Sequence, residues 1–168
     1  MIRVVLADIT TLKFDAIVNA ANETLLGGGV DGAIHHAAGP QLKAFCRTLG
    51  SCPTGEARIS PGFNLPAKWV IHTTGPVWRG GTFHEPAFLA NCYHNTLDLA
   101  LQHGVKTIAF PAISTGVYAY PKEQAAAIAV AIMREHEKQF DEIICCCYSA
   151  ADRKLYEKIV QPEGDSHE

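Results

Sequence analysis

The stretch NAANETLLGGGVDGAIHHAAG, residues 19–39, decides the fold and the chemistry that this sequence predicts. It continues an apolar, β-branched run at residues 16–18, so we expect a buried strand that ends in asparagines and passes into a glycine run. A helix opened by an acid is expected over residues 31–38. Because glycine has no Cβ, its backbone N–H groups can crowd around a ligand, and a helix N-terminus favours phosphate. An acid there suits a water or a sugar hydroxyl, so the segment predicts a site for a phosphate-bearing sugar with water chemistry.

Strands and helices alternate along the rest of the chain. We expect strands at residues 2–6, 16–18, 56–60, 69–73, 107–110 and 142–147, and helices at 31–38, 40–49, 86–103, 122–138 and 151–160. This alternation, with several strands apolar throughout, predicts an α/β sheet covered on both faces. The short gap between the third and fourth strands indicates a hairpin, so the sheet is expected to be mixed and mostly parallel. Residues 1–160 are predicted to form one domain, and 161–168 a polar, frayed tail.

The composition fits one globular domain with a sizeable core. Of the 168 residues, 48% are hydrophobic, and the formal net charge is −3. No basic run exists to follow a phosphate backbone, which argues against general nucleic-acid or membrane binding. The N-terminal residues lack a signal-peptide pattern, and no apolar run is long enough to span a bilayer. We therefore expect a cytoplasmic monomer.

Six cysteines raise the question of metals and disulfides. Three of them, Cys145, Cys146 and Cys147, are consecutive in a strand-like run, where neighbouring side chains point to opposite faces and cannot easily share one ion. There is no Cys-x-x-Cys pair, and the eight histidines show no ligand spacing along the chain. The sequence predicts reduced, buried thiols, and no metal or cofactor.

The glycine run formally contains Gly-x-Gly-x-x-Gly, at Gly27, Gly29 and Gly32. A dinucleotide-binding turn should follow its strand almost directly, but residues 22–26 intervene, and the ribose-binding acid about 20 residues later is missing. No Gly-Lys-Ser/Thr ends the loop, which excludes a P-loop. The motif alone therefore gives little support for a dinucleotide fold.

A second loop, FPAISTGVY at residues 110–118, lies between a predicted strand and a predicted helix. Ser114 and Thr115 offer hydroxyls, and Gly116 allows a ligand to approach the backbone closely. One such loop is most simply an ordinary strand–helix turn. Two in one small domain, both at the carboxyl ends of strands, are able to hold a diphosphate between them.

These two segments, together with residues 8–10 and 75–78, closely resemble the macrodomains, in particular the MacroD-type branch that includes bacterial O-acetyl-ADP-ribose deacetylases. The resemblance covers nearly the whole chain. It implies a three-layer α/β/α fold with a mixed, mostly parallel sheet. It also implies binding of ADP-ribose and metal-free hydrolysis of ADP-ribosyl esters, either on modified Asp or Glu side chains of proteins or on O-acetyl-ADP-ribose.

The resemblance implies an adenine end and a phosphate region in the ligand site. Asp8 matches the aspartate that accepts from the adenine amino group, Ile9 a backbone contact to the same ring, and Tyr148 a residue against adenine. From the residues alone, Asp8 is equally a solvated cap and Tyr148 a core aromatic. The matched phosphate-binding residues are Gly28, Gly29 and Val30 in the first loop and Ser114, Thr115, Gly116 and Val117 in the second.

The resemblance also implies the residues at the scissile bond. Asn22 matches an asparagine that hydrogen-bonds the distal ribose, Asp31 the acid that orients or activates the attacking water, and Tyr118 an aromatic against the distal ribose. Asn is also common in turns, and Asp is also a helix cap. His35 lies one helical turn after Asp31, where it either steadies the acid or simply packs.

One departure from the family pattern falls in the predicted catalytic loop. Related enzymes usually carry four glycines before Val-Asp-Gly, whereas this chain has three, so the segment between Asn22 and Asp31 is one residue shorter. A smaller departure is Ala7, where the family often has glycine. Two alternatives to an ester hydrolase therefore stay open: a reader that binds ADP-ribose without cleaving it, and an ADP-ribose-1″-phosphate phosphatase.

Overall fold

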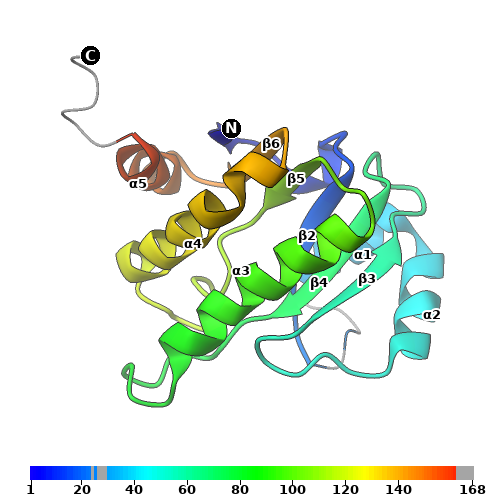
Figure 1. The fold of residues 1–168 in the computed structure, drawn as a ribbon. Coiled ribbons are helices and arrows are strands. Elements are labelled where there is room, and N and C mark those ends of the chain that lie inside the picture. The colour runs from blue at the N-terminus through cyan, green and yellow to red at the C-terminus, as the bar shows by residue number, and fades with distance from the viewer. Residues whose placement is uncertain (24, 26–29, 162–168) are drawn as a thin grey trace.

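The computed structural model describes residues 1–23, 25 and 30–161 of the chain. Its elements follow one another in the order β1 (Ile2–Leu6), η1 (Ile9–Thr11), β2 (Ala16–Ala21), α1 (Val30–Ala38), α2 (Pro40–Leu49), β3 (Ala57–Pro61), β4 (Trp69–Thr74), α3 (Glu85–Gln102), β5 (Thr107–Phe110), α4 (Lys122–His136), η2 (Glu137–Gln139), β6 (Glu142–Cys147) and α5 (Ala150–Val160). Figure 1 shows the sheet between two groups of helices, with α3 and α4 crossing in front of it. Residues 162–168 of the predicted tail lie outside the described residues, so that part stays a prediction.

The six strands form one sheet in the order β1-β6-β5-β2-β4-β3. All neighbours are parallel except β3 and β4, which are antiparallel. The mixed, mostly parallel sheet and the hairpin predicted from the sequence are therefore confirmed. Parallel neighbours bring the carboxyl ends of β1, β6, β5, β2 and β4 to one edge of the sheet.

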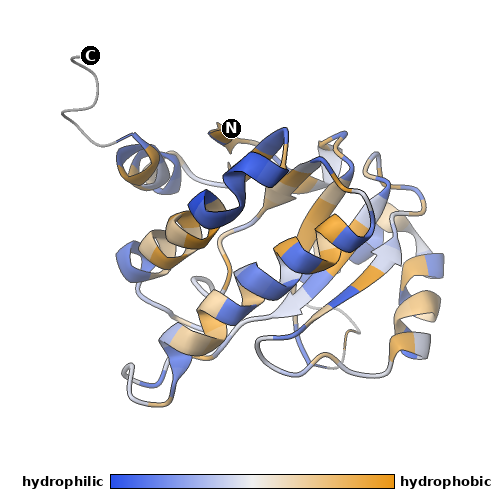
Figure 2. Cartoon of the chain, in the orientation of Figure 1, coloured by the Kyte–Doolittle hydropathy of each residue, from blue (hydrophilic) through white to orange (hydrophobic). Residues whose placement is uncertain are grey.

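Alternate residues of the central strands enter two separate cores. On one face, Val18 and Ile108 pack with apolar side chains of α3, α4 and α5. On the other face, Ile17 and Ala109 pack with apolar side chains of α1 and α2, among them Ile34. Figure 2 shows apolar and polar residues alternating along α3 and α4. Burial on both faces explains why these strands are apolar throughout, and the three-layer α/β/α arrangement is confirmed.

The cysteines lie in these cores, as predicted. All six are free and buried. Cys145 and Cys147 belong to the core under α3, α4 and α5, whereas Cys146 belongs to the opposite core. Burial raises the pKa of the Cys145 and Cys147 thiols to about 12. They are therefore protonated near neutral pH and poor nucleophiles.

Two predicted boundaries differ from the structure by more than one residue. The strand expected at residues 16–18 continues to Ala21, because β2 stays paired with β4 up to the Ala21–Thr74 neighbours. The helix expected to end at Lys138 ends at His136 and tightens into the 3-10 turn η2. Separately, within the described residues no helix combines the length and apolar character that a membrane crossing needs.

Candidate active site

The sheet topology places a ligand crevice between β2 and β5. The chain leaves β2 for α1 on one face of the sheet, and it leaves β5 for α4 on the opposite face. Because β2 and β5 are neighbours, the helices that follow them cover opposite faces, which leaves a crevice outside the carboxyl ends of the strands. In open α/β sheets, such a switch point is the usual place for a ligand.

A cavity of about 290 Å³ occupies this crevice. Its walls come from the ends of β2 and β4 and from the β5–α4 loop, through Ala20, Ala21, Asn22, Gly75, Ala112, Ile113, Ser114, Gly116, Val117 and Tyr118. The sequence predictions for Asn22, Ser114, Gly116, Val117 and Tyr118 therefore meet in one cavity. Thr115 belongs to the same loop, and its hydroxyl donates to the carbonyl oxygen of Ala112 at 3.3 Å.

Ser114 is the strained point of the β5–α4 loop. Its φ is 67°, a left-handed conformation that costs energy for a residue with a side chain. The side chain is 7% exposed, and its Oγ has no hydrogen-bond partner among the described residues. Gly75 makes this placement possible, because a Cβ there would lie 2.1 Å from the Ser114 Oγ. A buried, unpaired hydroxyl in a strained loop needs an explanation, and a ligand in the cavity supplies one.

The tip of the same loop presents backbone donors. Ala119 N–H donates to the Gly116 carbonyl oxygen, and Tyr120 N–H to that of Ser114, both at 2.9 Å, which fixes the turn. In the described part of the chain, the N–H groups of Gly116, Val117 and Tyr118 donate to no protein acceptor. Successive free N–H groups in a fixed turn form a concave anion site. The side chain of Val117, 98% exposed, leaves this backbone open.

Asp31 lies in the first turn of α1 and is 1% exposed. Its Oδ1 accepts a hydrogen bond from Asn19 Nδ2 at 2.5 Å and lies 3.2 Å from His35 Nε2. Its Oδ2 has no hydrogen-bond partner among the described residues. The Asn19 amide thus holds one oxygen of the carboxylate, whereas both ring nitrogens of the adjacent His35 have no hydrogen-bond partner among the described residues. Asp31 does not line the described part of the cavity; its partner Asn19 precedes the lining residue Ala20 on β2.

The support for Asp31 continues through the interior. Asn19 Nδ2 also lies 3.0 Å from His72 Nδ1, and His72 Nε2 lies 2.8 Å from Ser60 Oγ. Burial, with the neighbouring His35 as the smaller cause, lowers the pKa of His72 to about 3. The ring is therefore neutral at physiological pH; it accepts from Asn19 on Nδ1 and donates to Ser60 from Nε2.

The Asn19–His72–Ser60 chain was not predicted from the sequence. Asn19 and His72 are direct neighbours in the β2–β4 register, which only the paired strands reveal. The signal available in the sequence was the presence of Asn19 and His72 within otherwise apolar strand-like runs, where a buried polar side chain needs a partner. His35, for which packing and a contact with Asp31 were both open, is 11% exposed, and its Nε2 lies 3.2 Å from Asp31 Oδ1.

The predicted adenine-end residues lie further along the same sheet edge. Asp8 follows β1, and Tyr148 follows β6, its parallel neighbour. Asp8 is exposed; its Oδ1 accepts from the backbone N–H and hydroxyl of Thr10, at 3.0 and 2.7 Å, and so caps η1. Ile9 is buried, whereas Tyr148 is 56% exposed, which contradicts the alternative of a core aromatic. These three residues do not line the cavity at the β2–β5 crevice.

The shortened glycine loop is largely outside the described residues. This applies to the predicted phosphate contacts Gly28 and Gly29, and the side chain of Val30 is likewise not described. Their roles stay predictions.

Comparisons with known proteins agree with this geometry. The macro domain family model matches residues 18–129. A macro domain-containing protein of Ralstonia nicotianae is 62% identical over 93% of this chain and 92% of its own length. A Citrobacter rodentium protein named O-acetyl-ADP-ribose deacetylase is 50% identical over 98% of this chain and 97% of its own. The crystal structure of a Trypanosoma brucei macrodomain in complex with ADP-ribose superposes with a TM-score of 0.87 at 44% identity, covering 95% of this chain and 69% of that one.

The family match spans both halves of the cavity, from the end of β2 through the β5–α4 loop into α4. The relatives align over nearly the full described length, and the fold superposes closely. The chain therefore belongs to the macro domain family.

Proposed function

We propose that this protein binds ADP-ribose and hydrolyses ADP-ribosyl esters, namely mono-ADP-ribosylated Asp or Glu on proteins and O-acetyl-ADP-ribose. The observation that carries the proposal is the Asp31 carboxylate, which is buried and held on one oxygen while the other has no partner among the described residues. A relative named O-acetyl-ADP-ribose deacetylase and a neighbouring structure in complex with ADP-ribose support it.

In this proposal the ligand spans the carboxyl ends of the parallel strands. The adenine lies at the β1–β6 end, near Asp8 and Tyr148. The diphosphate accepts hydrogen bonds from the N–H groups of the β5–α4 loop, and the distal ribose contacts Asn22 and Tyr118. Three strand spacings of about 4.8 Å separate β1 from β2, a span that fits an extended nucleotide diphosphate.

The chemical step is attack by water on the ester of the distal ribose. Asp31 Oδ2 accepts a proton from the water as the water oxygen bonds to the substrate. The ester bond then breaks and the proton passes to the leaving oxygen, which releases the carboxylic acid and ADP-ribose. A base placed this way typically contributes about 10²–10⁴-fold to the rate. The hydrogen bond from Asn19 keeps the carboxylate from turning away, so its geometry is fixed before substrate binds.

The test is release of ADP-ribose from a protein carrying glutamate-linked mono-ADP-ribose, by wild type, Asp31→Ala and Asp31→Asn. We expect both variants to lose at least about 100-fold in turnover. ADP-ribose affinity measured by calorimetry should stay within about tenfold, roughly 1.4 kcal/mol. Asp31→Asn keeps the acceptor for Asn19, so its melting temperature controls for folding. Isotopically labelled water then locates the bond that breaks, by whether label enters the released acid or the ribose.

Each contrary outcome has one meaning. Full turnover by Asp31→Asn would remove Asp31 from the mechanism. Intact ADP-ribose binding with no release by wild type from this substrate or from O-acetyl-ADP-ribose would make the protein a reader, and release of phosphate from ADP-ribose-1″-phosphate would make it a phosphatase. Absence of ADP-ribose binding would contradict the whole proposal.

A further inference from the structure

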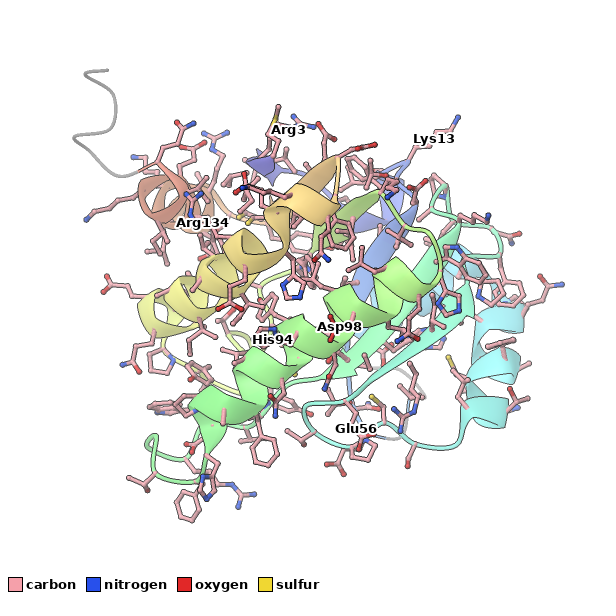
Figure 3. All side chains as sticks on the ribbon, in the orientation of Figure 1. Arg3, Lys13, Glu56, His94, Asp98 and Arg134 are labelled. Carbon is pink, nitrogen blue, oxygen red and sulfur yellow. The ribbon has the colours of Figure 1, made fainter. Side chains whose placement is uncertain are left out.

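Three metal-ligating side chains meet between α3 and α4. His94 on α3 and Glu135 and His136 on α4 offer ligand atoms that all lie within 4.8 Å of one another. His94 Nε2 is 3.6 Å from Glu135 Oε2, and His136 Nε2 is 3.4 Å from the carboxylate of Asp98, one turn after His94 on α3. Figure 3 shows His94 and Asp98 on the part of α3 that runs alongside α4.

His136 is oriented as a metal ligand would be. Its Nδ1 lies 3.1 Å from the carbonyl oxygen of Ile132 on the preceding turn, so the Nδ1–H donates there and Nε2 carries the lone pair. Metal-ligating histidines typically fix their second ring nitrogen by such a hydrogen bond. The side chain is only 12% exposed, so packing also holds the ring in place.

The spacing of the ligand atoms fits a small cation. Bonds of about 2.0–2.1 Å in tetrahedral geometry place ligand atoms about 3.3 Å apart. His94 Nε2 and Glu135 Oε2 are 3.6 Å apart, and all three ligand atoms lie within 4.8 Å of one another. Two imidazoles and a carboxylate form a donor set that suits zinc and its first-row neighbours rather than calcium or magnesium. The Asp98 carboxylate adds negative charge beside the site, which favours a cation.

We propose that His94, Glu135 and His136 form a divalent-cation site of the zinc class, which joins α3 to α4. The Asp98 carboxylate contacts His136 Nε2, which is the ligand atom, so the Asp98 side chain must rotate when a metal binds. It then either becomes the fourth ligand or leaves the fourth coordination position to water. None of these residues lines the cavity between β2 and β5. The site therefore acts on stability, because a cation that binds only the folded chain stabilises it by mass action.

The competing explanation is a pair of ordinary surface contacts, His94 with Glu135 and His136 with Asp98. Exposed ion pairs of this kind are worth little, typically under about 1 kcal/mol, and they need no metal. The two explanations differ in what zinc does to the protein, and in which substitutions matter.

The experiment uses the full chain without a histidine tag and titrates it with zinc chloride by calorimetry. We expect one zinc ion per chain, with a dissociation constant on the order of 10 μM or tighter, and a melting temperature that rises with zinc. His94→Ala and His136→Ala should each weaken binding at least tenfold. His103→Ala, at the exposed C-terminal end of α3, is the matched control and should bind as wild type does.

Cobalt replaces zinc in a second measurement that identifies the ligand atoms. Histidine and carboxylate ligands give d–d bands without the thiolate charge-transfer band that cysteine ligands would add, which separates this site from the six buried thiols. Three results would overturn the proposal. They are no zinc binding by wild type at a zinc concentration about 100 times the expected dissociation constant, zinc binding unchanged in both histidine variants, or a thiolate charge-transfer band in the cobalt spectrum. Unchanged melting temperatures of the variants without metal show that any loss of binding is not loss of folding.

Discussion

The two sides of the candidate site are built in opposite ways. After β2, the site depends on one buried carboxylate, Asp31, whose position is set by side chains from several elements. After β5, it depends on the backbone, because the N–H groups of the loop tip are held by turns within residues 114–120. One region is a side-chain network in the interior; the other is a local backbone conformation at the surface.

This difference predicts which measurements respond to which substitutions. A carboxylate held by Asn19, with His72 and Ser60 behind it, should lose its alignment when residues distant in the sequence change. A backbone loop should respond only to residues that touch the loop itself. Substitutions in the first region should therefore lower turnover, and those in the second should lower affinity.

The largest effect is expected from Asn19→Leu, which removes the amide between Asp31 and His72 with little change in volume. The carboxylate then stays buried without its 2.5 Å donor, which should cost about 3 kcal/mol in the free energy of unfolding. Turnover should fall by about 100-fold, the loss typical of a roughly 1 Å displacement of a catalytic group. Urea unfolding and single-turnover ADP-ribose release measure the two effects.

Asn95→Leu is the matched control. Its amide donates to the Gly55 carbonyl oxygen at 2.7 Å, away from the cavity, so this variant loses a hydrogen bond without affecting Asp31. Equal turnover losses in the two variants would show that the interior network does not position the carboxylate.

The same contrast separates what the sequence could and could not predict. The β5–α4 loop is contiguous, so Ser114, Thr115 and Gly116 were identifiable from their order along the chain. Asn19 and His72 are 53 residues apart and meet only through the β2–β4 register. Likewise, the histidines show no ligand spacing along the sequence, because His94 and His136 come together only when α3 packs on α4. Local patterns predicted the strands, the helices and the anion loop, whereas contacts between elements required the structure.

A smaller effect, confined to the second region, is expected from Gly75→Ala. The new Cβ would lie 2.1 Å from Ser114 Oγ and 2.7 Å from Ile113 Cγ2, so the β5–α4 loop must shift. Such overpacking typically costs about 1–3 kcal/mol. We expect ADP-ribose affinity, measured by calorimetry, to fall about tenfold or more.

Ser114→Gly in the Gly75→Ala background is the rescue. It removes the closest contact, and glycine adopts the φ of 67° without strain. Affinity should recover in part. If the double variant binds as weakly as Gly75→Ala, or if Gly75→Ala binds as wild type does, the loop does not depend on the close approach of Gly75 to Ser114.

The smallest expected effect is a pH dependence of the free energy of unfolding, which comes only from the side-chain network behind Asp31. The pKa of His72 is lowered to about 3 by burial, so below about pH 6.5 the unfolded chain binds a proton that the folded chain does not. The free energy of unfolding should therefore fall with decreasing pH, by up to about 1.4 kcal/mol per pH unit from this group, until the pH approaches 3.

His72→Gln should reduce the slope of stability against pH between pH 6 and 4 by about one proton, whereas His36→Gln, at an exposed position on α1, should leave it unchanged. Urea unfolding at a series of pH values measures the slope, which does not depend on how stable each variant is. An unchanged slope in His72→Gln would mean that the ring is already protonated in the folded chain; it would then have no lone pair for the Asn19 amide, and the network behind Asp31 would have to be assigned differently.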